Sequence, residues 1–153
     1  MKRTITAVTL AALGAMGLAS SRASGAAIEQ AEAITIYETW LDFHAQRSAE
    51  LAIAMTSENF VMVSQETPMD RDTALGYLQA LSQFVVTRQC TNRVVHTHPT
   101  DDKKGRLLLA RVDCSLQTLT GPLEAHFLET VVIDGRGDIT YDHVAEVANP
   151  SLP

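Results

Sequence analysis

Basic residues are scarce in this sequence: its 153 residues include 12 Lys and Arg against 18 Asp and Glu. Nucleic acids and anionic lipids are bound through clustered positive charge, so this balance argues against both as partners. The sequence also has no Cys and His pattern with zinc-ligand spacing, no Gly-rich phosphate loop and no Ser-His-Asp spacing. We therefore expect no metal site and no cofactor.

The chain has no apolar run as long as the roughly 20 residues of a transmembrane helix. Its longest such run, from Ile5 to Leu18, follows the positive pair Lys2 and Arg3 and precedes small residues. This pattern predicts a cleaved secretory signal peptide over residues 1–26, and so a periplasmic or secreted protein. No cysteine lies near the cleavage window, which argues against a lipid anchor. Removing the signal leaves nine basic and eighteen acidic residues, a net charge of −9.

Only two cysteines are present, Cys90 and Cys114, and the strongest turn signal of the chain lies midway between them at residues 99–106. A hairpin that turns there places the two cysteines opposite each other on adjacent strands. Opposed antiparallel positions are close enough for a disulfide, and an exported protein would keep one. We predict a structural disulfide; the alternative is two separately buried thiols.

The order of periodic segments predicts an α+β domain over residues 28–147. Apolar residues recur first at helical spacing and then, after Phe84, with a period of two. We expect a helix, a short helix capped by Ser48, a short strand, a helix capped by Asp70 or Asp72, and three or four antiparallel strands, over residues 28–46, 48–55, 60–65, 70–84 and 84–147. A break is expected at 57–59, and the tail, 148–153, is expected to fray.

Three motifs in this order resemble the NTF2-like superfamily and its SnoaL-like members, which include ketosteroid isomerase, limonene epoxide hydrolase and scytalone dehydratase. They are MDRDTAL (69–75), TRQCTNRVV (87–95) and IDGRGDIT (133–140). The resemblance implies that N-terminal helices pack on a strongly curved antiparallel sheet around a cone-shaped apolar pocket. Many members are dimers, so it also implies a homodimer. Because this fold carries unrelated chemistries, the reaction must be argued from individual residues.

Arg111 and Asp113 are two apart on one expected strand and therefore share a face. Such a pair lowers the pKa of the carboxylate and fixes its orientation. The stretch RVDCSLQTLTG (111–121) resembles the limonene epoxide hydrolase segment that supplies an Arg and an Asp, which implies that Arg111 orients Asp113 and Asp113 donates a proton. The family then has a second acid on the last strand; Val144 occupies that position, and Asp142 lies two residues earlier on the same face.

Glu129 is the one charge among the odd, otherwise apolar positions of the strand 123–133. Apolar surroundings raise the pKa of a carboxyl and let it remain a hydrogen-bond donor. Measured from the turn at 135–137, Glu129 matches the ketosteroid isomerase acid of the oxyanion hole, and the resemblance implies that role. The alternative is that Arg111, Asp113 and Glu129 form one ion-paired cluster that stiffens the sheet.

His126 is expected close to these acids, where it would serve either as a general base near neutral pH or as a structural residue. The expected pocket wall combines aromatic residues of the first helix with strand residues, some at positions where the family holds water: Tyr37, Trp40, Met62, Ser64 and Phe127. The same aromatic side chains also fit a plain core.

We therefore expect an exported protein that binds a small apolar molecule and carries out cofactor-free acid/base chemistry, such as dehydration, isomerisation, cyclisation or epoxide opening. One alternative is a non-catalytic carrier, for which a mainly apolar open cavity is expected. Another is a dimeric interaction module, for which a filled cavity and an apolar outer sheet face are expected. An enzyme requires Asp113 or Glu129 inside an open cavity.

Overall fold

A computed structural model describes residues 26–45 and 48–147. The expected signal peptide therefore lies outside the described residues except for Ala26, and the expected frayed tail lies outside them as well. No helix within the described ranges is both long enough and apolar enough to cross a membrane.

The elements follow the predicted order, with one additional strand. They are α1 (Gln30–Ala45), α2 (Ala49–Ala54), β1 (Thr56–Ser64), β2 (Thr67–Asp70), α3 (Arg71–Phe84), β3 (Val85–Pro99), β4 (Arg106–Thr118), β5 (Gly121–Ile133) and β6 (Ile139–Glu146). Helices followed by a mostly antiparallel sheet confirm the α+β class.

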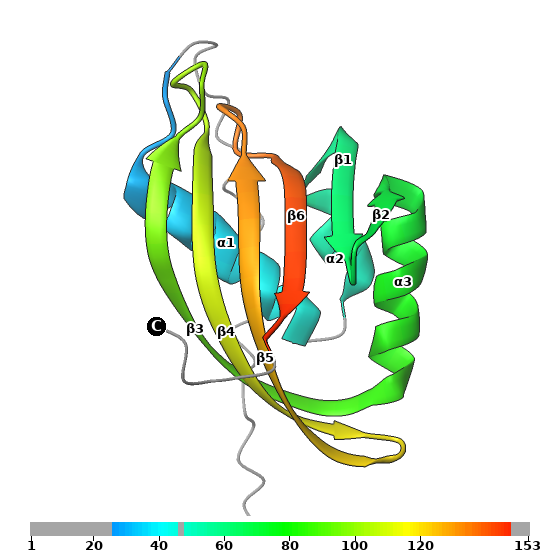
Figure 1. The fold of residues 1–153 in the computed structure, drawn as a ribbon. Helices are drawn as coiled ribbons and strands as arrows, with labels where there is room; N and C mark the ends of the chain where they lie inside the picture. Colours follow the sequence, from blue (N-terminus) through cyan, green and yellow to red (C-terminus); the bar gives the residue numbers. More distant parts are fainter. Residues whose placement is uncertain (1–25, 46–47, 148–153) are drawn as a thin grey trace, which may run out of the picture.

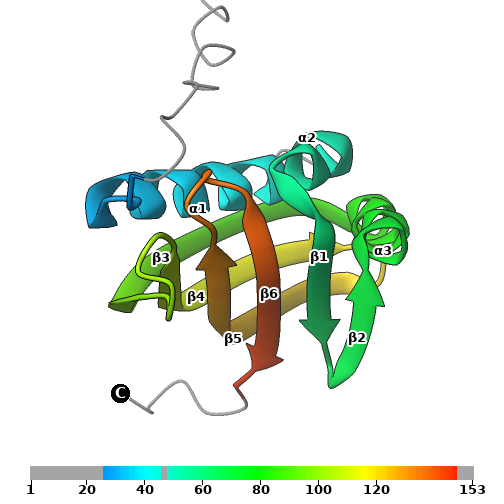
Figure 2. The same cartoon turned by 90° about the horizontal axis from the view of Figure 1, so that it is seen from above.

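A single six-stranded sheet has the order β2-β1-β6-β5-β4-β3. β1 pairs parallel with β6, and every other pair is antiparallel. The long strands are strongly curved; α1 lies across one face of the sheet, and α3 stands beside β1 and β2 (Figures 1 and 2). The concave inner face is thus covered by helices, and none of the described helices lies on the convex outer face.

The core lies between α1 and the inner face of the sheet. Tyr37, Trp40 and Leu41 of α1 are buried there, and the Trp40 ring meets Phe60 of β1 edge-on, with 5.9 Å between ring centroids. Their spacing of three and four residues places them on one side of the helix, as the periodicity predicted.

Three local predictions differ from the structure around β1. The expected break at 57–59 lies inside β1, which pairs with the parallel neighbour β6 from Thr56 onward. Residues 67–70 form an extra strand, β2; because β2 is at the sheet edge, Pro68 is tolerated there. Ser48 precedes α2, but its side chain makes no capping hydrogen bond.

The start of α3 and the first long hairpin follow the predictions. Asp70 caps α3, since its Oδ1 accepts a hydrogen bond of 2.9 Å from the Thr73 amide. Cys90 and Cys114 face each other across β3 and β4 and form a disulfide. The hairpin turn pairs Pro99 with Arg106, half a residue off the expected centre, and a bulge in β3 between residues 94 and 96 restores the cysteine register.

Candidate ligand-binding site

The register of β4 and β5 separates the predicted site residues onto two faces of the sheet. Ala110 lies opposite Glu129, and Asp113 lies opposite His126. Glu129 therefore shares the inner face with the even-numbered residues of β4, while Arg111 and Asp113 point outward. The idea of one group holding Arg111, Asp113 and Glu129, as a site or as an ion-paired cluster, is wrong because the sheet itself lies between them.

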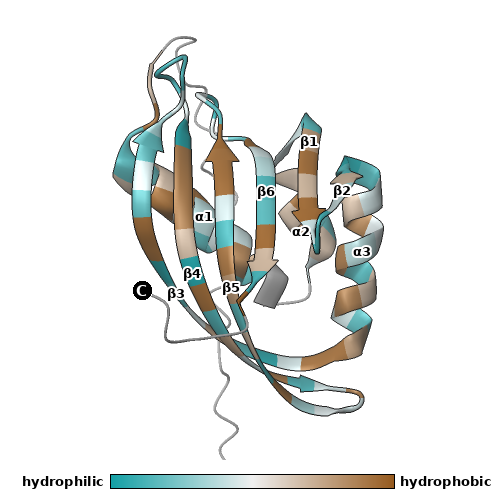
Figure 3. Cartoon of the chain, in the orientation of Figure 1, coloured by the Kyte–Doolittle hydropathy of each residue, from teal (hydrophilic) through white to brown (hydrophobic). Residues whose placement is uncertain are grey.

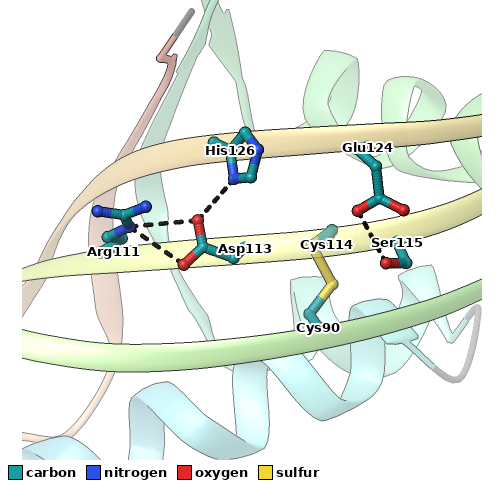
Figure 4. Close-up of polar contacts among 7 residues, drawn as sticks. All are labelled: Cys90, Arg111, Asp113, Cys114, Ser115, Glu124 and His126. Carbon is teal, nitrogen blue, oxygen red and sulfur yellow. Dashed lines mark hydrogen bonds and ion pairs between the residues drawn. A yellow bond between two sulfur atoms is a disulfide. The ribbon is translucent and has the colours of Figure 1, made fainter. Parts of the chain in front are cut away.

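Arg111, Asp113 and His126 form a polar cluster on the outer face, shown in Figure 4. The Nε of Arg111 donates to Asp113 with an N–O distance of 3.1 Å, and Nδ1 of His126 lies 2.7 Å from Oδ1 of Asp113. These contacts, first that with His126 and then that with Arg111, lower the pKa of Asp113. The predicted pairing of Arg111 with Asp113 is confirmed, and all three side chains are partly exposed.

A cavity of about 300 Å³ opens on the inner face, between the sheet, α3 and the ends of α1 and α2. Its walls are mainly apolar. The junction where α3 passes into β3 contributes lining residues from Phe84 to Arg88, and Figure 3 shows hydrophobic residues concentrated at that junction. The lining includes Leu41, Met62, Leu78, Leu81, Phe84, Val86, Val112, Leu116, Leu123, Ala125, Phe127 and Val144. A volume at the lower end of the range for small-molecule sites suits a compact ligand.

Two acids line the cavity, Glu129 and the exposed Glu146; Glu129 is the buried one, only 4% exposed. The hydroxyl of Tyr37 donates to its Oε2 with an O–O distance of 2.7 Å. Burial raises the pKa of Glu129, while the Tyr37 hydrogen bond and the positive charge of Arg88 act in the opposite direction. Burial, with the charge of Glu129, also raises the pKa of Tyr37, so this hydroxyl keeps its proton.

Asp142 is fully buried behind this wall, beside Met62 of β1 and Val131 of β5. Its carboxyl lies near enough to Glu129 to be influenced electrostatically, yet neither oxygen has a hydrogen bond of standard geometry to another described residue. Burial and the charge of Glu129 raise the pKa of Asp142 well above its ordinary value. The hydrogen bond from Tyr37 and the positive charge of Arg88 favour the charged form of Glu129, whereas the charge of Glu129 disfavours ionisation of Asp142.

Arg88 is a cavity residue that the sequence reasoning did not single out. Its signal was its position two residues before Cys90: a cysteine paired with the inward-facing Cys114 must itself face inward, and so must its neighbour at i−2. The guanidinium is half-buried, and burial lowers its pKa. A positive charge thus lies on the wall of the same cavity as Glu129.

The predicted pocket residues divide between the wall and the layer behind it. Met62, Ser64 and Phe127 line the cavity, whereas Tyr37 and Trp40 are absent from its lining and lie in the core behind it. Within the described ranges, no three His, Cys, Asp or Glu side chains gather in a way that could hold a metal ion.

The sequence matches no protein-family model and no curated protein. The structure of this chain is similar to several solved structures. A ketosteroid isomerase-like protein from Erwinia carotovora atroseptica has a TM-score of 0.66 and 10% identity, covering 78% of this chain and 96% of that one. An NTF2-like protein from an Exiguobacterium species has a TM-score of 0.62 and 10% identity, covering 74% of this chain and 99% of that one. A scytalone dehydratase-type protein from Novosphingobium aromaticivorans has a TM-score of 0.61 and 12% identity, covering 74% of this chain and 80% of that one.

These similarities show that the chain has the NTF2-like fold that its motifs predicted. At such identities the likeness concerns the fold, and it carries no activity over to this chain. The chemistry must therefore be argued from the cavity itself.

Proposed function

We propose that the protein binds a small, mainly apolar molecule in the inner cavity and that Glu129 acts on this molecule as an acid or base. One observation carries the proposal: a buried carboxylate faces into an open cavity with mainly apolar walls. A carboxylate in such surroundings exchanges protons with a bound molecule without a cofactor.

The protonation states of the buried acids support this choice. The pKa of Asp142 is raised well above its ordinary value by burial and by the charge of Glu129, so we assign the negative charge of the pair to Glu129, which faces the ligand. Two carboxyl groups with separated pKa values serve dehydration, isomerisation, cyclisation or epoxide opening. Two of the similar structures are named for an isomerase and a dehydratase, which supports chemistry of this kind. The proposal gives no role in the cavity to Arg111, Asp113 or His126.

A non-catalytic carrier is the second candidate, and the predominance of apolar residues in the lining favours it. An interaction module is less well supported, since the cavity is open and a polar cluster occupies the outer face. The fold resemblance also leads us to propose a homodimer, which the native mass of the protein would test.

We also propose that the chain is exported and that residues 1–26 are removed. The Cys90–Cys114 disulfide supports an oxidising compartment. The intact mass of the protein recovered from its native compartment would test the cleavage.

Binding of the neutral fluorophore N-phenyl-1-naphthylamine tests the cavity. Ala125→Phe adds a ring inside the cavity, and we expect it to weaken binding of the fluorophore at least about tenfold. Ala145→Phe makes the same change on the outer face of β6 and serves as the matched control. Equal binding by both variants would place the fluorophore elsewhere and remove the support for an internal site.

Glu129→Gln separates the enzyme from the carrier once a ligand is identified. An enzyme loses turnover while the ligand still binds, whereas a carrier has no turnover to lose. Asp113→Asn, on the opposite face, is the control and is expected to leave both binding and turnover unchanged.

A further inference from the structure

Arg88 places a positive charge on the cavity wall at the start of β3. It lies opposite Leu116 of β4, and both residues line the cavity. Withdrawing a guanidinium from water is costly unless an anion compensates for it, and Arg88 is half-buried. An arginine keeps its charge in a protein, so the cost must be met by a partner.

The partners of Arg88 within the described part of the chain leave most of its donors unused. Its Nε lies 2.8 Å from the Sγ of Cys90. Its two terminal nitrogens, Nη1 and Nη2, have no hydrogen bond, and no carboxylate forms an ion pair with it in residues 26–45 and 48–147. Glu129 acts on Arg88 only at longer range. The forked end of the guanidinium is therefore available to a molecule in the cavity.

We propose that the ligand is an apolar molecule bearing a single oxyanion, in the simplest case a carboxylate, and that the terminal nitrogens of Arg88 bind this oxyanion. The inference rests on the proposed function and specifies the ligand class for the same cavity. The apolar lining takes the body of the molecule, and the guanidinium fork matches a carboxylate through two parallel hydrogen bonds.

Glu129 is compatible with such a ligand. The Tyr37 hydroxyl already donates to the Oε2 of Glu129, and Asp142 behind it is protonated. Glu129 and Asp142 together therefore carry one negative charge at most, and not two. Arg88 lies on β3 and Glu129 on β5, with β4 between them in the sheet. An oxyanion held at Arg88 would thus leave the neighbouring carbon atoms of the ligand facing Glu129.

Octanoate and 1-octanol form a matched pair of probes, since they share a chain length and differ in charge. Isothermal titration of the wild-type protein should give at least about tenfold tighter binding of octanoate. Arg88→Met should weaken octanoate binding by about ten- to hundredfold and change octanol binding by less than about threefold, while Arg88→Lys retains part of the preference. Arg93→Met, on the outward side of β3, is the control and should behave as wild type.

Equal affinities of wild type for octanoate and octanol would overturn the inference, as would undiminished octanoate binding by a folded Arg88→Met variant. Should Arg88→Met fail to fold, the wild-type pair of probes and Arg88→Lys decide. The neutral fluorophore N-phenyl-1-naphthylamine distinguishes failure of the ligand class from failure of the proposed function. If the fluorophore binds and octanoate binds no more tightly than octanol, the ligand class alone is wrong. If neither the fluorophore nor octanoate binds, the proposed function fails and this inference with it.

Discussion

At the scale of single residues, the buried acid pair sets the behaviour of the site. Asp142 is 0% exposed and Glu129 is 4% exposed; burial raises the pKa of both, and the charge of Glu129 raises that of Asp142 further. Such a pair is expensive for the folded protein at neutral and alkaline pH, because the unfolded chain ionises both groups freely. A cost of this kind is characteristic of functional sites.

The pH dependence of stability should report this cost. Burial raises the pKa of Asp142 above its ordinary 3.8, so the folded protein keeps a proton that the unfolded chain releases. The free energy of unfolding should therefore decrease as pH rises through the raised pKa, by at most about 1.4 kcal/mol per pH unit. Asp142→Asn removes this ionisation and should flatten the profile from urea titrations above about pH 5.

Asp113→Asn provides a control of opposite sign. Hydrogen bonds lower the pKa of Asp113, so its contribution to stability is present at neutral pH and lost only as pH falls through the lowered value. It should leave the slope above about pH 5 unchanged. If Asp142→Asn showed the same slope as wild type, Asp142 would not be the protonated partner.

The Tyr37 hydroxyl is the donor that stabilises the charge on Glu129. Tyr37→Phe removes a buried hydrogen bond to a charged group and should reduce the free energy of unfolding by about 1–3 kcal/mol. Tyr141→Phe on the outer face, whose ring packs against His143, is the control and should cost less. Equal losses for the two variants in chemical denaturation would remove the special role of Tyr37.

At the scale of elements, the disulfide fixes the register of β3 against β4 and so the position of Arg88. It closes a sequence separation of 24 residues. Loop-closure entropy predicts that reduction, or a Cys90→Ser/Cys114→Ser double variant, reduces the free energy of unfolding by about 3 kcal/mol. Equal stability of the wild type with and without reductant would contradict a structural role for the bridge, and the double variant should not respond to reductant.

The sequence predicted the helix order, the cysteine register and the inward position of Glu129, because alternation along one strand is a local property. It did not place Arg111 and Asp113 correctly relative to Glu129, since that relation depends on the register between two strands. The signal was present in β4, where Leu108, Ala110, Val112 and Cys114 form the apolar series and the intervening positions carry the charges. β2 was missed because its proline argues against a strand, although a short strand at the sheet edge tolerates one.

At the scale of the whole molecule, the curved sheet separates two chemical environments. Its inner face holds the cavity with Arg88 and Glu129, and its outer face holds the cluster of Arg111, Asp113 and His126. The two environments draw on alternating residues of the same strands, such as Val112 and Asp113 of β4. Variants on one face therefore serve as matched controls for the other.

The central claim is that the inner cavity holds a small molecule. The most direct test is native mass spectrometry of the protein purified from its natural source, followed by denaturation and identification of any molecule released. The account predicts an apolar molecule with one acidic group, retained by Asp113→Asn and lost from Ala125→Phe, whose cavity is filled. A wild-type protein that is empty on purification and that also fails to bind N-phenyl-1-naphthylamine would contradict the account.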